Sequence, residues 1–255
     1  MARQFTASSS QYGENTSAVP FQDGAYTISA WVWFDTNTPA NERFIALSES
    51  GGHHIMLAYA AGSWFFRLND GGNKDIQQVV GVSADTWIHV CALSESVSSR
   101  RLYIDNVEVA ASPNTATASS NTWTDTRVAV HETVSANHLD GRLARVGWWN
   151  VALNADERTA LFEGAPPGSV RPESLAAWHE FDDDNSSTVI DRWYNGIDLT
   201  LQGGSGGWAE GPEGLWYPTN SRKTSVVAAA PTITADMWGI QQSQPNPPSV
   251  AVVSY

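Results

Sequence analysis

Residues 86–110, TWIHVCALSESVSSRRLYIDNVEVA, decide the fold. From Trp87 to Leu93 the side chains alternate with the period of a strand that packs on at least one face. A second strand follows over 102–104, and Asp105-Asn106 tolerate the positive φ that a two-residue hairpin turn requires. His89 is the only residue of this stretch suited to proton transfer. The stretch therefore predicts a β scaffold and not a reactive site.

Short apolar runs between polar or glycine-rich connections continue along the chain, from AYTISAWVWFD (25–35) to GIDLTLQGG (196–204). Many short strands, without the strand–helix alternation of a parallel sheet, predict an all-β antiparallel sandwich of two sheets. One short helix is expected within LNADERTALFEGAPPG (153–168). Asn154 can cap its first turn, and Gly164 with the prolines that follow ends it.

Charge and cysteine content exclude several classes of protein. The chain of 255 residues has 14 Lys+Arg against 27 Asp+Glu, a formal net charge of −13, which disfavours nucleic acid as a partner. The single cysteine, Cys91, lies in a strand pattern and is expected to be a small buried residue. Residues 1–21 lack the apolar run of a secretory signal, and no stretch has the length of a membrane span. We therefore expect synthesis in a cytoplasm, without a signal peptide, and no membrane partner.

The composition changes after Trp216-Tyr217. Residues 218–255 are rich in Pro, Ser, Thr, Gln and Ala, and keep neither a helical nor a strand period for long. Such a segment buries too little apolar surface to offset its ordering entropy when it stands alone in water. We therefore expect a globular domain over 1–217 and an extended tail over 218–255 that docks on another subunit. The expected anchors of this tail are Trp238, Val250, Val252, Val253 and Tyr255.

Four segments, in their order along the chain, resemble the laminin-G-like branch of the concanavalin A-like lectin/glucanase superfamily. In that family a Trp-x-His-Val strand precedes a Leu-Tyr-Val-Asp-Gly hairpin, and here Ile104 stands for the valine and Asn106 for the glycine. The other three segments are residues 26–34, 139–164 and 175–204. The resemblance implies a concanavalin A-like jelly roll of two sheets.

The chain departs from the family where a cation site is expected. In many members the glycine-led strand continues Ile-Asp-Glu, and acidic groups near there help to hold calcium. This chain has Leu143-Ala144-Arg145, an alanine and a cation in place of oxygens. We therefore expect no cofactor, and Ca²⁺ stays only as an alternative.

The stretch HEFDDD (179–184) is the best candidate for chemistry. The resemblance to the retaining glucanases of the superfamily implies that Glu180, Asp182 and Asp184 alternate on one face of a strand as nucleophile, orienting group and acid. A resemblance to legume lectins implies a metal site instead, with Asn185 and Asp191 as further oxygens. A solvated acidic loop that closes a strand is the third interpretation, and the one we favour. We therefore predict neither catalytic residues nor a metal site.

Aromatic side chains near strand ends are candidates for stacking on sugar rings. Trp193 and Tyr194, beside polar neighbours, and Trp123 are the expected carbohydrate contacts. Trp31 and Trp33, two apart on one strand, are expected to fill the core, with sugar stacking as their alternative.

Three hypotheses of function follow. The first is a non-catalytic structural subunit on the surface of a particle, most plausibly a bacteriophage head or tail decoration, assembled with other subunits as a homo-oligomer. The second is a carbohydrate-binding, adhesive lectin module with glycans as partners. The third and weakest is a glycoside hydrolase.

Overall fold

The computed structural model describes residues 1–22, 24–49, 52–96, 98–109, 122–131, 137–182, 187–193, 195–204 and 207–212. The chain divides into two units, Met1–Trp216 and Tyr217–Tyr255. All described residues belong to the first unit, so the predicted tail and its anchors lie outside them. No helix in the described part of the chain has the length and hydropathy needed to cross a membrane.

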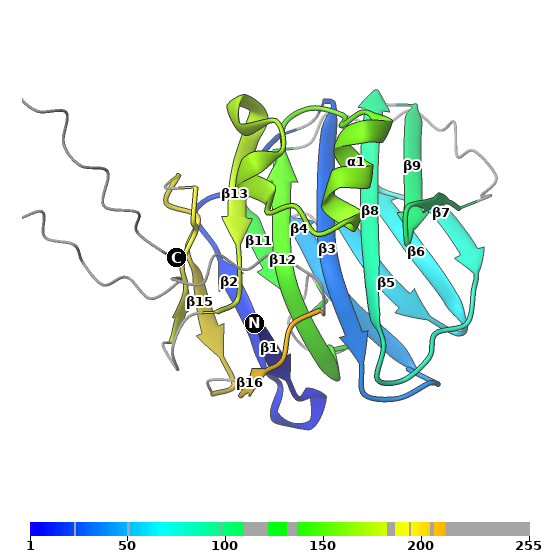
Figure 1. Ribbon diagram of the computed structural model, residues 1–255, viewed down its shortest axis with the longest axis vertical. Helices are drawn as coiled ribbons and strands as arrows, with labels where there is room; N and C mark the ends of the chain where they lie inside the picture. Colours follow the sequence, from blue (N-terminus) through cyan, green and yellow to red (C-terminus); the bar gives the residue numbers. More distant parts are fainter. Residues whose placement is uncertain are drawn as a thin grey trace, which may run out of the picture. The chain divides into compact units, whose positions relative to one another are not determined.

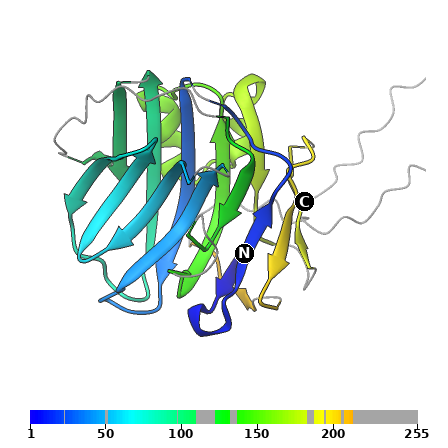
Figure 2. The same ribbon diagram turned by 180° about the vertical axis from the view of Figure 1, so that it is seen from behind.

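The first unit is a sandwich of two antiparallel sheets, each of eight strands in the described residues (Figures 1 and 2). Sheet A runs in the order β10 (Val107–Glu108), β9 (Ser99–Ile104), β8 (Trp87–Ser96), β3 (Tyr26–Phe34), β12 (Gly141–Trp149), β1 (Ala2–Phe5) and β16 (Trp208–Ala209), and β13 (Leu175–His179) also pairs with β12. Sheet B runs in the order β14 (Thr188–Val189), β15 (Leu199–Gln202), β2 (Tyr12–Asn15), β11 (Asp125–Val128), β4 (Asn41–Ser48), β5 (His54–Ala60), β6 (Ser63–Asn69) and β7 (Asn73–Val79). The predicted all-β, two-sheet fold is confirmed.

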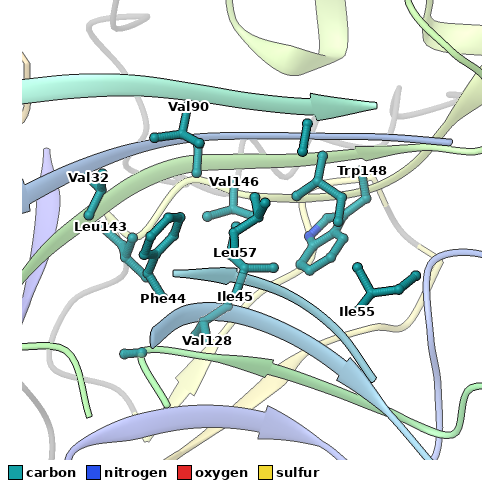
Figure 3. Close-up of a cluster of buried hydrophobic side chains, with 14 of the residues drawn as sticks. Val32, Phe44, Ile45, Ile55, Leu57, Val90, Val128, Leu143, Val146 and Trp148 are labelled. Carbon is teal, nitrogen blue, oxygen red and sulfur yellow. The ribbon is translucent and has the colours of Figure 1, made fainter. Parts of the chain in front are cut away.

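The core lies between the inner faces of the two sheets (Figure 3). Aliphatic side chains of both sheets meet there, with Val32 and Leu143 from sheet A opposite Ile45 and Leu57 from sheet B, all four fully buried. Each such side chain contributes roughly 1.5–3 kcal/mol when it leaves water. Because strand residues alternate between faces, the residues beside them in sequence point to the outer faces.

Two local predictions are confirmed in detail. Asp105 and Asn106 have φ of 48° and 63°, the left-handed values that the predicted hairpin turn needs. The single α-helix of the described residues, α1 (Ala155–Phe162), begins with Asn154 as its cap. The Asn154 side chain accepts a hydrogen bond from the Glu157 backbone, and the Glu157 carboxylate accepts one from the Asn154 backbone. Three 3-10 turns, Ala7–Ser9, Pro167–Ser169 and Pro172–Ser174, complete the helical elements of this part of the chain.

The prediction that Trp31 and Trp33 fill the core is wrong. Between them on β3, Val32 is fully buried in the core, whereas both tryptophans are only partly buried. Their side chains therefore lie on the outer face of sheet A. α1 lies over this face at β3 and β8 (Figure 1). The face is thus divided between a part beneath the helix and a part beyond it.

Candidate functional site

The acidic stretch that follows β13 is not an alternating strand. β13 ends at His179, and Phe181 has a φ of 60°, so the chain turns between Glu180 and Asp182. This turn removes the alternation that the glucanase alternative needs. The favoured interpretation, a solvated acidic loop, is wrong for Glu180 and Asp182, which are only 5% and 7% exposed. Asp184 lies outside the described residues.

Both described carboxylates of this stretch are paired with arginines. Arg145 donates from Nε to Glu180 Oε1 at 2.9 Å, and the indole of Trp178 donates to Glu180 Oε2 at 2.8 Å. Arg192 pairs with Asp182. Burial raises the pKa of Glu180, and the charge of Arg145 opposes that rise. The cation that the sequence places at 145 is therefore the partner of the carboxylate at 180.

Asp191, a further oxygen of the alternative metal site, serves the backbone, and Asn185 lies outside the described residues. Its carboxylate accepts hydrogen bonds from the amides of Trp178 and Trp193 on Oδ1 at 3.0 and 2.9 Å. Its Oδ2 accepts from the amides of Asn195 and Ile197 at 3.1 and 3.4 Å. Across the residues that the structure describes, no three His, Cys, Asp or Glu side chains come together to hold a metal ion.

A serine and a histidine are paired inside sheet A. Ser29 Oγ lies 2.8 Å from His89 Nε2, and both residues are at most 2% exposed. His89 Nδ1 finds no acceptor among the described residues, so no carboxylate orients the ring. Burial lowers the pKa of His89 to about 3. The pair is closed to solvent and lacks the third member of a hydrolytic triad.

The predicted sugar contacts fall in different surroundings. Trp193 is partly exposed and packs beside Trp178 at the edge of a small apolar cluster. Trp123 is 1% exposed and belongs to the core, so its ring offers no face for stacking. The residue does line an open pocket of about 430 Å³, together with residues 16–19, Gln22 and Thr124. Tyr194 lies outside the described residues, and contact of these residues with a sugar stays a prediction.

One part of the outer face of sheet A, which we call the covered half, lies beneath α1 and residues 163–174. Trp149 of β12 is fully buried there, and its indole donates to the carbonyl of Val170 at 2.8 Å. Phe162, the last residue of α1, stacks on Trp31 with ring centroids 6.2 Å apart and planes 12° apart. Arg145 donates to the carbonyl of Gly164 within the same half.

The other part, the open half, carries a row of four side chains across four strands. Trp87 of β8 pairs with Trp33 of β3, Trp33 with Arg142 of β12, and Arg142 with Gln4 of β1. All four are partly exposed. On β3, Trp33 is the next outward-facing residue after Trp31, which is in contact with the last residue of α1.

Close contacts fix the geometry of this row. The Trp33 and Trp87 rings lie 5.6 Å apart at 61°, and the guanidinium carbon of Arg142 lies 4.5 Å from the Trp33 ring centroid. Arg142 Nε donates to Gln4 Oε1 at 2.9 Å, and Gln4 Nε2 donates to Asp35 Oδ2 at 2.7 Å. The open half therefore presents indole rings, a guanidinium, an amide and a carboxylate to solvent.

Arg142 has no carboxylate partner within the part of the chain that the structure describes. Among the described residues its guanidinium forms one hydrogen bond, from Nε, and both terminal nitrogens have no acceptor there. Four other partly exposed arginines are paired with carboxylates: Arg67 with Asp75, Arg101 with Glu108, Arg171 with Glu157 and Arg192 with Asp182. Arg158 has no such partner and lies over the ring of Tyr103.

Of this row, only Trp33 was considered for sugar stacking from the sequence, as an alternative to a core position, although the sequence holds a signal for its outward face. Thr27 and Ser29 share a strand face with Trp31 and Trp33, whereas the alternate positions of β3 are all apolar. Polar residues at two of four positions mark the outer face. The contribution of Arg142 had no such signal, because it depends on the pairing of β12 with β3.

Comparison with known proteins now identifies the family. A family model described as the concanavalin A-like lectin/glucanases superfamily matches residues 7–157. The chain belongs to this superfamily. The predicted resemblance is thereby confirmed. No relative among curated proteins matches the sequence.

Solved structures of this superfamily fold include two that are similar over most of the chain. A putative carbohydrate binding protein from Bacteroides ovatus aligns with a TM-score of 0.58 and 15% identity, over 83% of this chain and 60% of that one. A heptameric SAP-like pentraxin from Limulus polyphemus aligns with a TM-score of 0.50 and 12% identity, over 76% and 88% of the two chains. This chain therefore spans only 60% of the length of the Bacteroides protein. At these identities the similarity shows the fold.

Proposed function

We propose that the protein is a non-catalytic carbohydrate-binding module that holds a sugar against the open half of sheet A. The observation that carries this proposal is the row of Trp33, Trp87, Arg142 and Gln4. A pyranose ring has apolar C–H faces and a polar rim. Partly exposed indoles suit the faces, and fixed donors and acceptors beside them suit the hydroxyl groups.

A binding role, without catalysis, is supported by the acidic stretch. A retaining glycosidase needs two free carboxyl groups on either side of the scissile bond. Here Glu180 and Asp182 are paired with Arg145 and Arg192. The fold is shared with a putative carbohydrate binding protein, and this likeness agrees with the proposal.

A glycan array tests the function directly. We expect the full chain to bind a subset of glycans, and Trp33→Ala and Trp87→Ala to weaken that binding at least tenfold, because each change removes an indole face. Trp193→Ala changes a partly exposed tryptophan outside the row and serves as the matched control, with binding close to that of the wild type. Circular dichroism and thermal unfolding of each variant separate loss of binding from loss of fold.

Three results would contradict the proposal. The wild-type chain binds no glycan, both row variants bind as the wild type does, or Trp193→Ala alone abolishes binding. The third result would place the sugar at the contact predicted from the sequence. Hydrolysis of a bound β-glucan that disappears in Glu180→Gln would restore the enzyme hypothesis.

The role on a virion or other particle surface stays a prediction. It depends on residues 218–255, which lie outside the described residues. Deletion of this segment is expected to abolish incorporation into an assembly, and full incorporation of the shortened chain would rule out docking by the tail.

A further inference from the structure

We propose that the saccharide bound at the open half carries a carboxylate, which Arg142 binds through its two terminal nitrogens. This inference rests on the proposed carbohydrate-binding function and adds the charge class of the ligand.

The guanidinium of Arg142 is held in one orientation before any ligand arrives. Its Nε is tied to Gln4 at 2.9 Å, and its carbon lies 4.5 Å from the centroid of the Trp33 ring. Two fixed contacts on a planar group leave little freedom to the terminal nitrogens. A rigid pair of N–H donors matches the two oxygens of a carboxylate in the bidentate arrangement that arginine favours.

Arg142 is one of two partly exposed arginines without a carboxylate partner among the described residues, and Arg158, the other, donates instead to the carbonyl of Leu153. The sequence has 27 acidic and 14 basic side chains, so most surface arginines find a carboxylate within the protein. Arg142 finds none among the described residues, although Asp35 lies one hydrogen bond beyond Gln4. The amide of Gln4 links the two groups, because it accepts from Arg142 Nε and donates to Asp35 Oδ2. The terminal nitrogens thus stay available to an external anion.

The long-range repulsion between an acidic protein and an acidic ligand does not oppose this contact strongly. Physiological salt screens exposed charges beyond about 8 Å, whereas a bidentate pair acts at hydrogen-bond distance. The neighbouring rings specify a sugar acid over a free anion, because Trp33 and Trp87 place apolar surface directly beside the guanidinium. A pyranose ring that carries a carboxylate would contact the indoles through its apolar face and the guanidinium through the carboxylate.

Matched ligand pairs test the inference with the full chain. We would titrate trigalacturonate against its methyl ester, and sialyllactose against its methyl ester, by isothermal calorimetry, with a sulfated lactose as a third anion. For at least one pair we expect the carboxylate form to bind at least tenfold more tightly, an advantage that shrinks as NaCl is raised. The sulfate ester is expected to bind more weakly than the carboxylate, because its single negative charge is spread over three oxygens instead of two.

Variants at position 142 assign the preference. Arg142→Gln removes the charge and is expected to abolish the advantage of the carboxylate form. Arg142→Lys keeps the charge but loses the planar fork, and is expected to keep only a small part of that advantage. Arg171→Gln, which removes an arginine paired with Glu157 outside the open half, is the matched control and keeps the full advantage.

The outcomes separate this inference from the function on which it rests. Equal affinity for both members of each pair, or an advantage that survives in Arg142→Gln, overturns the charge assignment alone if the array still shows glycan binding that depends on Trp33. A stronger advantage for the sulfate ester also overturns it. Absence of all glycan binding overturns both.

Discussion

The covered and open halves share one face of one sheet, yet they use arginine in opposite ways. In the covered half, Arg145 is 2% exposed and is bonded to Glu180 and to the carbonyl of Gly164. In the open half, Arg142 is partly exposed, lies on an indole ring and meets no described carboxylate. Both belong to β12 and are separated by two residues. The cover of α1 and residues 163–174 therefore decides whether a charge on this strand serves the fold or faces solvent.

Removal of the buried arginine tests the covered half most severely. Arg145→Ala leaves the Glu180 carboxylate buried without its cation, and we expect it to lower the free energy of unfolding by about 3–5 kcal/mol. Urea unfolding followed by tryptophan fluorescence measures this loss. The double variant Arg145→Met, Glu180→Leu is expected to recover most of the stability, because it removes both charges. A loss below about 1 kcal/mol in the single variant, as for an exposed pair, would show that the two halves do not differ.

Acid is the second way to test the covered half, because His89 lies there beneath Phe162 of α1, with ring centroids 6.0 Å apart. Burial lowers the pKa of His89 from 6.5 in the unfolded chain to about 3 in the folded one. The unfolded state therefore binds more protons below pH 6.5, and stability falls as the pH drops from about 6.5 toward 3. Between pH 7 and pH 5, this group alone lowers the free energy of unfolding by about 2 kcal/mol.

The contribution of His89 to this pH dependence is measured as the difference between the wild type and a variant without the ring. The loss of stability from pH 7 to pH 5 is measured for the wild type and for His89→Gln, which has no titrating ring. We expect the variant to lose about 2 kcal/mol less than the wild type. The same loss in both proteins would mean that the ring is protonated in the folded state near its ordinary pKa.

The smallest effect is expected in the open half. Arg142→Gln removes a contact with the Trp33 ring and a hydrogen bond to Gln4, both partly exposed. We expect a loss of at most about 1 kcal/mol in the free energy of unfolding. The same urea titration as for Arg145→Ala provides the measurement. A loss of 3 kcal/mol or more, on the order expected for a buried charge, would make Arg142 a structural residue.

The comparison also shows what the sequence could predict. The hairpin turn at Asp105-Asn106 and the capped helix at Asn154 follow from local backbone chemistry, and both are confirmed. The outward position of Trp33 was missed because aromatic residues fit either face of a strand that has apolar residues on both. The pair of Arg145 with Glu180 joins residues 35 apart, and only the pairing of β12 with β13 brings them together.

The central claim is that the open half is the binding surface, and indole NMR tests it most directly. The uniformly ¹⁵N-labelled chain would be titrated with the glycan that binds best on the array, with indole signals assigned from single Trp→Phe variants. We expect the signals of Trp33 and Trp87 to move and those of the buried Trp148 and Trp149 to stay. Shifts confined to Trp193 or Trp123, with Trp33 and Trp87 unchanged, would contradict the account.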